Sequence, residues 1–120
     1  MLVVRGDIAG RRMTITSFGY KNGAPAEKPG VVIIDVRAMF LNPHHNPALR
    51  KLTGKDNAVK AYVMRTPNFN ALYDHLVHCA SVPGVDEVHI GCVGGRHRSV
   101  AIAEMLGARL GVEVRHRDLK

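Results

Sequence analysis

The chain has 120 residues, 46% of them hydrophobic, and this length suits one folded domain with a single core. Its 17 Lys and Arg against 10 Asp and Glu give a formal net charge of +7, so we expect anionic partners such as a phosphorylated metabolite or nucleic acid. Two isolated Cys, few aromatic residues and no membrane-length apolar run argue against a disulfide scaffold, a base-stacking platform and a membrane protein, and they favour a cytoplasmic location.

The first half of the chain predicts two strands and two short helices. Residues 13–18 alternate and are rich in β-formers, and a turn-rich loop follows over 19–30. The continuous apolar run 31–36 is typical of a strand covered on both faces. After an irregular stretch with two prolines, Asn46 and Pro47 predict a helix that ends at Thr53 and Gly54. Asp56 then predicts the start of a second short helix.

The second half of the chain alternates helices with strands. Apolar residues at helical spacing predict a long helix that Thr66 and Pro67 open and Pro83 and Gly84 end, and its core face is Phe69, Leu72, Tyr73, Leu76 and Ala80. A strand to Ile90, a helix from about Ser99 to Leu110 and a last strand over 112–115 follow. We therefore predict one α/β domain over residues 1–120, with a mostly parallel sheet of about four strands flanked by helices.

The segment 88–99 predicts a phosphate-binding loop between a strand and a helix. Gly94 and Gly95 carry no Cβ, so the backbone can close around an anion. Arg96, His97 and Arg98 add charged donors, and the amides at the following helix N-terminus favour a phosphate there.

The same loop fits a second chemistry. Cys92, Arg98 and Ser99 form the Cys-x5-Arg-Ser pattern of cysteine-dependent phosphatases, in which the thiolate attacks and the arginine holds the phosphoryl oxygens. Asp35 or Asp118 would then be the general acid, although neither stands at a telling spacing. The plain alternative is that Cys92 is a buried packing residue.

Polar residues also lie at the carboxyl end of the strand over 31–36. Asp35 and Arg37 share one face of this strand, and the sequence allows either a ligand role or a local salt bridge between them. The loop with His44 and His45 follows and could close over the same crevice. No histidine spacing matches a zinc pattern, so we expect no metal site.

With these motifs placed, the chain resembles the C-terminal domain of the RNase adapter protein RapZ family. The resemblance extends from Ser17 to Leu119, in matching order. Its carriers are the segments 17–25, 35–37, 42–44, 49–56, 90–100 and 116–119.

This resemblance implies a module that binds glucosamine-6-phosphate, a phosphorylated amino sugar, rather than an enzyme with a cofactor. Matching positions in this sequence would place Lys21, Asp35, Arg37, His44, Cys92, Gly94, Gly95, His97 and Arg98 at that ligand, together with their loop neighbours Val93, Arg96 and Ser99. Family members usually have Thr at the position of Val93, so one hydroxyl donor is missing here. The family's N-terminal nucleotide-binding domain has no counterpart, so ATP binding is not carried over.

The resemblance also implies contacts with a small regulatory RNA and a ribonuclease, and it is compatible with a homo-oligomer. The residues we expect to contact RNA phosphates are Arg11, Arg12, Arg50, Lys51, Lys55, Lys60, Arg115 and Arg117. Without the family, a solvated basic surface would account for the same charges.

Overall fold

The computed structural model describes residues 13–120. Within them the strands are β1 (Thr14–Gly19), β2 (Val31–Asp35), β3 (Glu87–Cys92) and β4 (Val114–His116). The helices are α1 (Asn57–Met64), α2 (Phe69–Ala80) and α3 (Arg98–Leu110), and two 3-10 turns are η2 (Tyr20–Asn22) and η3 (Pro43–His45). The predicted α/β class, the parallel sheet and the three longer helices are confirmed.

The four strands form one sheet in the order β2-β3-β1-β4, and every neighbouring pair is parallel. In the central pair, Thr14 lies opposite Glu87 and Gly19 lies opposite Cys92, so β1 and β3 end at the same edge of the sheet. Ligands of open parallel sheets bind beyond this edge, and the loops that follow β1 and β3 meet there.

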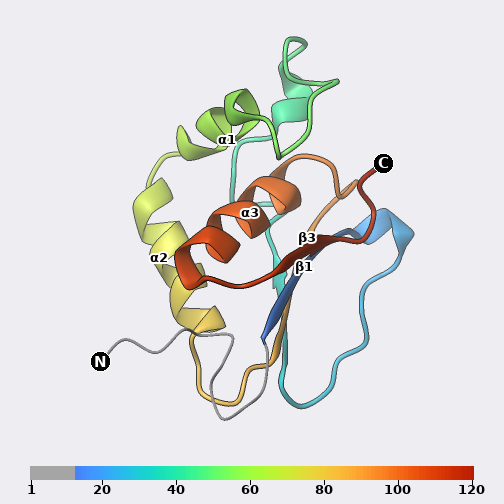
Figure 1. Ribbon diagram of the computed structural model, residues 1–120. Helices are drawn as coiled ribbons and strands as arrows, with labels where there is room; N and C mark the ends of the chain where they lie inside the picture. The colour runs from blue at the N-terminus through green and yellow to red at the C-terminus, as the bar shows by residue number, and fades with distance from the viewer. Residues whose placement is uncertain (1–12) are drawn as a thin grey trace.

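All three helices cover the same face of the sheet (Figure 1). One hydrophobic cluster joins Ile15 and Ile90 of the strands to Leu76 of α2 and to Ile102 and Leu106 of α3, and each of these five side chains is at most 1% exposed. The connection from β1 to β2 contains no α-helix and runs on the other side of the sheet (Figure 1). This arrangement is the one that right-handed crossovers between parallel strands require.

The predicted burial of the second strand on both faces is wrong. β2 forms an edge of the sheet, and Val31, Val32 and Ile33 are only partly buried, whereas Ile34 enters the core. The reason is that the helices cover one face alone, so a continuous apolar run in this strand leaves half of its side chains outside the main core.

The predicted helix over 46–52 is also wrong, because this segment is a series of turns. Asn46 does cap it, accepting the Ala48 N–H at its side-chain oxygen (3.0 Å) and the Leu49 N–H at its carbonyl (2.9 Å). The carbonyl of Leu52, however, accepts a hydrogen bond from the Arg96 guanidinium rather than from a continuing helix (2.9 Å). A distant side chain thus ends the helical pattern.

Smaller differences concern element ends. The last strand is 114–116 rather than 112–115, because Gly111 adopts φ +67° and the Val112 N–H returns to the Gly107 carbonyl, which extends the end of α3. No helix within residues 13–120 combines the length and the apolar character needed to cross a bilayer.

Candidate functional site

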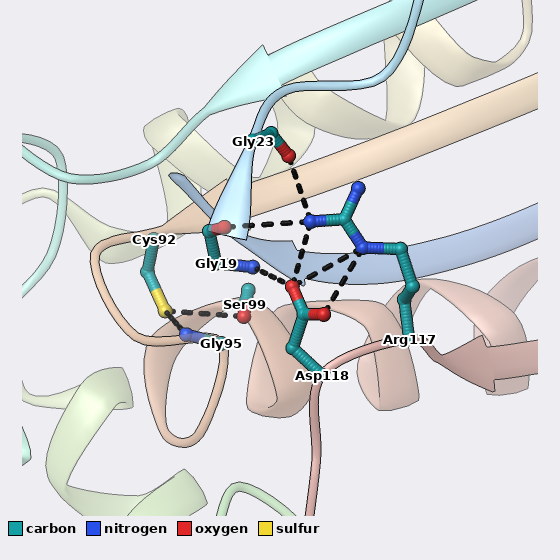
Figure 2. Close-up of polar contacts among 7 residues, drawn as sticks. All are labelled: Gly19, Gly23, Cys92, Gly95, Ser99, Arg117 and Asp118. Carbon is teal, nitrogen blue, oxygen red and sulfur yellow. Dashed lines mark hydrogen bonds and ion pairs between the residues drawn. The ribbon is translucent and has the colours of Figure 1, made fainter. Parts of the chain in front are cut away.

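The loop that joins β3 to α3 is held in shape by its glycines. Gly95 has φ +72°, and its N–H donates to the Cys92 Sγ at 3.3 Å (Figure 2). A Cβ at Gly95 would lie 2.7 Å from the backbone N of Gly19. Both the backbone angle and the lack of space therefore require glycine at this position.

The N-terminus of α3 lacks a protein cap. His97 is the N-cap residue, makes no side-chain capping bond and accepts its first helical bond from Ala101. The N–H groups of Arg98, Ser99 and Val100 find no acceptor within residues 13–120, although these three residues are buried. Such unpaired amides at the positive end of a helix dipole favour an anion.

A cavity of about 530 Å³ opens beside this helix end. The residues that line it are Lys21, Asn22, Asn42, His44, Arg50, Cys92, Val93, Gly94, Arg96, His97, Arg98, Asp118 and Lys120. Five of them are Lys or Arg and one is Asp, so the lining carries an excess of positive charge. The cavity therefore places cations beside the uncapped end of α3, of which Arg98 itself lines it, and this combination of charges and helix dipole favours a phosphate.

The cations of the loop differ in what they do. Arg98 is 6% exposed, donates from Nη1 to the Arg37 carbonyl (2.5 Å) and forms no ion pair with a described carboxylate. Arg96 instead holds the neighbouring segment, since its guanidinium donates to the carbonyls of Lys51 and Leu52. Arg98 is thus the buried charge that an anionic ligand would neutralise.

Two histidines face one another across the cavity. The ring centroids of His44 and His97 are 6.5 Å apart, and the His97 Nε2 lies 3.2 Å from the Arg50 carbonyl. Burial lowers the pKa of His97 below its usual 6.5, although backbone contacts to Leu52 and Arg50 oppose this shift. We therefore expect a neutral His97 in the free protein at neutral pH.

This pKa shift predicts that the free protein loses stability as the pH falls below about 6.5. The unfolded chain takes up a proton on His97 there while the folded chain resists it, so the free energy of unfolding decreases until the pH reaches the folded pKa. Urea unfolding at pH 7.5 and 5.5 checks this, with His97→Gln expected to flatten the dependence and His45→Gln, an exposed neighbour, as the control. An equally steep dependence in His97→Gln would contradict it.

Asp35 and Arg37 do not line the cavity and instead pair with each other. The Arg37 Nη2 lies 2.7 Å from the Asp35 Oδ2, and the guanidinium carbon stacks 3.8 Å from the centroid of the Tyr20 ring. Hydrogen bonding from Arg37 lowers the pKa of Asp35. Of the two roles that the sequence allowed, the local salt bridge is the one observed.

The geometry gives a cysteine phosphatase no support. Cys92 is 3% exposed and its Sγ contacts the Ser99 Oγ at 3.1 Å, with Ser99 fully buried. The pKa values of Asp35 and Asp118 are both lowered, chiefly by hydrogen bonds from Arg37 and Arg117. Because both carboxyls are ionised at neutral pH, neither can supply a proton as the general acid.

Of the predicted ligand residues, Lys21, His44 and six of the loop residues meet in the cavity, while Gly95 and Ser99 lie buried behind it. Three further residues that the sequence did not predict also line the cavity, namely Asn22, Asn42 and Lys120, and Arg50, predicted to contact RNA, lies there as well. Of these residues only Asn42 could have been found from the sequence, because an Asn before Pro43 and His44 is typical of a turn cap. Its side chain accepts the His44 N–H (3.1 Å).

The predicted RNA contacts fall into separate groups. Arg11 and Arg12 lie outside the described residues, and Arg50 lines the cavity. Lys51 and Lys55 are exposed and Lys60 is half-buried, whereas Arg115 and Arg117 form ion pairs with Glu113 and Asp118.

In the part of the chain described here, no three His, Cys, Asp or Glu side chains are grouped to hold a metal ion.

Comparison with known proteins points to one family. The family model described as the RapZ C-terminal domain matches residues 11–120. Curated relatives include nucleotide-binding proteins of Rhodospirillum rubrum (42% identical, 88% of this chain and 37% of the relative) and Rubrobacter xylanophilus (42%, 91% and 41%). Another, from Trichlorobacter lovleyi, is 37% identical over 98% of this chain and 46% of its own length. The chain thus spans less than half the length of these relatives.

Proposed function

Since the chain belongs to the RapZ C-terminal domain family, we propose that it is a binding module for a phosphorylated amino sugar of the glucosamine-6-phosphate type. The observation that carries this proposal is the buried, uncapped N-terminus of α3 beside a cation-lined cavity. The phosphate would accept from the amide and the guanidinium of Arg98 at the positive end of the α3 dipole, and His97 would become protonated beside it.

The lysine that follows β1 supports the same assignment. Lys21 is exposed and lines the cavity, and its Nζ would be 3.9 Å from a Cβ built on Gly94. The Lys21 N–H also donates to the Val93 carbonyl at 3.1 Å, which fixes this lysine beside the loop. A charge-assisted bond from its ammonium group would strengthen phosphate binding.

Replacing Lys21 with alanine is expected to weaken binding of glucosamine-6-phosphate by at least about tenfold, because one charge-assisted hydrogen bond contributes roughly 1.5–3 kcal/mol. Isothermal titration calorimetry against glucosamine-6-phosphate, glucose-6-phosphate and inorganic phosphate measures this loss and ranks the ligands. Lys55→Ala is the matched control, since it removes the same charge from an exposed position outside the cavity. Equal affinities of the two variants, or no binding by the unmodified protein, would contradict the proposal.

We also propose that the module contacts RNA through its exposed lysines. Lys51 and Lys55 are exposed and form no ion pair with a described carboxylate, so both are available to backbone phosphates. In the same variant set, Lys55→Ala should reduce the salt dependence of RNA affinity by about one released counterion, while Lys21→Ala serves as its control. Undetectable or salt-insensitive RNA binding would remove this half of the proposed function.

A further inference from the structure

One feature of the cavity is at odds with an anion site: a carboxylate, that of Asp118, lines it among the cations. Its side chain is only 13% exposed, and its Oδ2 accepts the Gly19 N–H at 2.7 Å. Arg117 approaches the same carboxylate from Nε (3.1 Å to Oδ1) and Nη2 (2.8 Å to Oδ2). The negative charge of Asp118 is therefore already neutralised by Arg117. The carboxylate oxygens accept hydrogen bonds from Arg117 and from Gly19 at the end of β1.

Arg117 extends this contact along the same turn. Its Nη2 donates to the Gly23 carbonyl at 2.7 Å (Figure 2). Its guanidinium carbon lies 5.2 Å from the centroid of the Phe18 ring. The Arg117 and Asp118 side chains thus hold both ends of the segment 19–23, which contains Lys21. We call this set of contacts the C-terminal clamp.

The segment held by the clamp is in turn packed against the loop after β3. A Cβ on Gly19 would lie 2.5 Å from the Gly94 carbonyl carbon, and a Cβ on Gly95 would lie 3.1 Å from the Asp118 Cβ. Gly19, Gly95 and Asp118 are therefore in close mutual contact. The loop cannot shift without moving the turn, and the turn cannot move without breaking the clamp.

The clamp is anchored by a chain of polar contacts at the end of β4, the strand that precedes it. The His116 Nδ1 lies 2.7 Å from the Ser17 Oγ, and its Nε2 lies 2.7 Å from the Glu104 Oε2 of α3. The Arg117 N–H donates to the Ser17 carbonyl at 3.0 Å. These bonds fix β4 against β1 and α3, so the two residues that follow have a rigid base.

From these contacts we propose that Arg117 and Asp118 are positioning residues for the phosphate loop, rather than contacts to RNA or a catalytic acid. This inference rests on the proposed function for its effect on ligand affinity. Its structural part, that the clamp keeps the loop closed over Cys92, stands independently of any ligand. It assigns a role to Asp118, the one acidic residue of the His116-Arg117-Asp118 segment, that charge pattern alone does not suggest.

The two cysteines of the chain provide a test that needs no ligand. Cys92 is buried in the clamped loop, whereas Cys79 is half-buried on α2 and serves as an internal reference. In Asp118→Ala we expect iodoacetamide to label Cys92 at least tenfold faster, with the Cys79 rate unchanged, as measured by peptide mass spectrometry. Asp118→Asn should give an intermediate rate, because its amide oxygen still accepts the Gly19 N–H while the ion pair to Arg117 is lost.

The matched control is Glu113→Ala, which breaks the exposed ion pair with Arg115 on the same chain segment without touching the turn. Cys92 labelling in both Asp118 variants that equals the Glu113→Ala rate, or a parallel rise at Cys79, would overturn the clamp. Should Asp118→Ala fail to fold, the Asp118→Asn rate decides alone.

Glucosamine-6-phosphate affinity should fall about tenfold in Asp118→Ala. If the unmodified protein binds no phosphorylated ligand but Cys92 is still exposed in the variant, the proposed function fails and the clamp stands.

Discussion

Replacement of Arg98 by methionine is expected to weaken binding of a phosphorylated ligand by about 100-fold while leaving the free protein as stable as before, or more so. Arg98 is 6% exposed and forms no ion pair with a described carboxylate, so in the free protein its buried charge is offset only by a weaker attraction to Asp35. Methionine fills a similar volume without that charge. The one hydrogen bond lost is the one to the carbonyl of Arg37, and this bond is only partly buried.

Calorimetric titration with glucosamine-6-phosphate and thermal unfolding of the free protein measure the two effects separately. Arg109→Met is the control, because Arg109 is an exposed arginine in the last turn of the same helix. The two readouts are expected to move in opposite directions in Arg98→Met and to stay unchanged in Arg109→Met. A variant that loses stability and affinity together would indicate that Arg98 is mainly a structural residue.

The second large effect concerns two adjacent glycines. Gly95→Ala is expected to destabilise the fold by about 3 kcal/mol or more, because alanine at φ +72° is strained and its Cβ would meet the Gly19 backbone N at 2.7 Å. Gly94→Ala should cost less than about 1 kcal/mol, since the nearest atoms to its Cβ belong to the flexible Lys21 side chain at 3.9 Å.

Urea unfolding of both variants at pH 7.5 tests this difference, with the slope against denaturant confirming that the same surface is exposed on unfolding. The comparison is internal, since the two substitutions add the same methyl group one residue apart in the same loop. Equal losses would mean that the loop rearranges to accept the Cβ of Gly95, and the close packing against the turn after β1 would then not limit it.

Hydrophobic periodicity was enough to predict the main elements. The apolar positions Phe69 and Leu76 define the buried face of α2 as expected, and the run before Gly91 and Cys92 forms β3. These signals are local, because each helix or strand buries one face that its own residues encode. The phosphate-binding role of the glycine loop is a prediction that the unpaired amides support and a ligand experiment must test.

What the sequence could not provide is how distant segments meet. The turns before Gly54 look helical until the Arg96 side chain takes the carbonyls of Lys51 and Leu52. Gly54 itself packs so closely on α3 that a Cβ there would lie 2.3 Å from the Ala101 N. Such contacts join residues 44 to 47 positions apart in the sequence, and no local pattern encodes them. Arg50 lines the cavity because it lies in this same segment, which packs against Arg96 and α3.

The cavity draws its lining from Lys21, just after the first strand of the described chain, and from Lys120 at the last residue. A small molecule that contacts both would form a reversible, non-covalent cross-link between two segments that are distant in the sequence. Its binding would suppress local opening of both segments and slow digestion by proteases such as trypsin, which cleaves after basic residues such as Lys21. The protein would then survive longer in the presence of a protease when the ligand is bound than when it is absent.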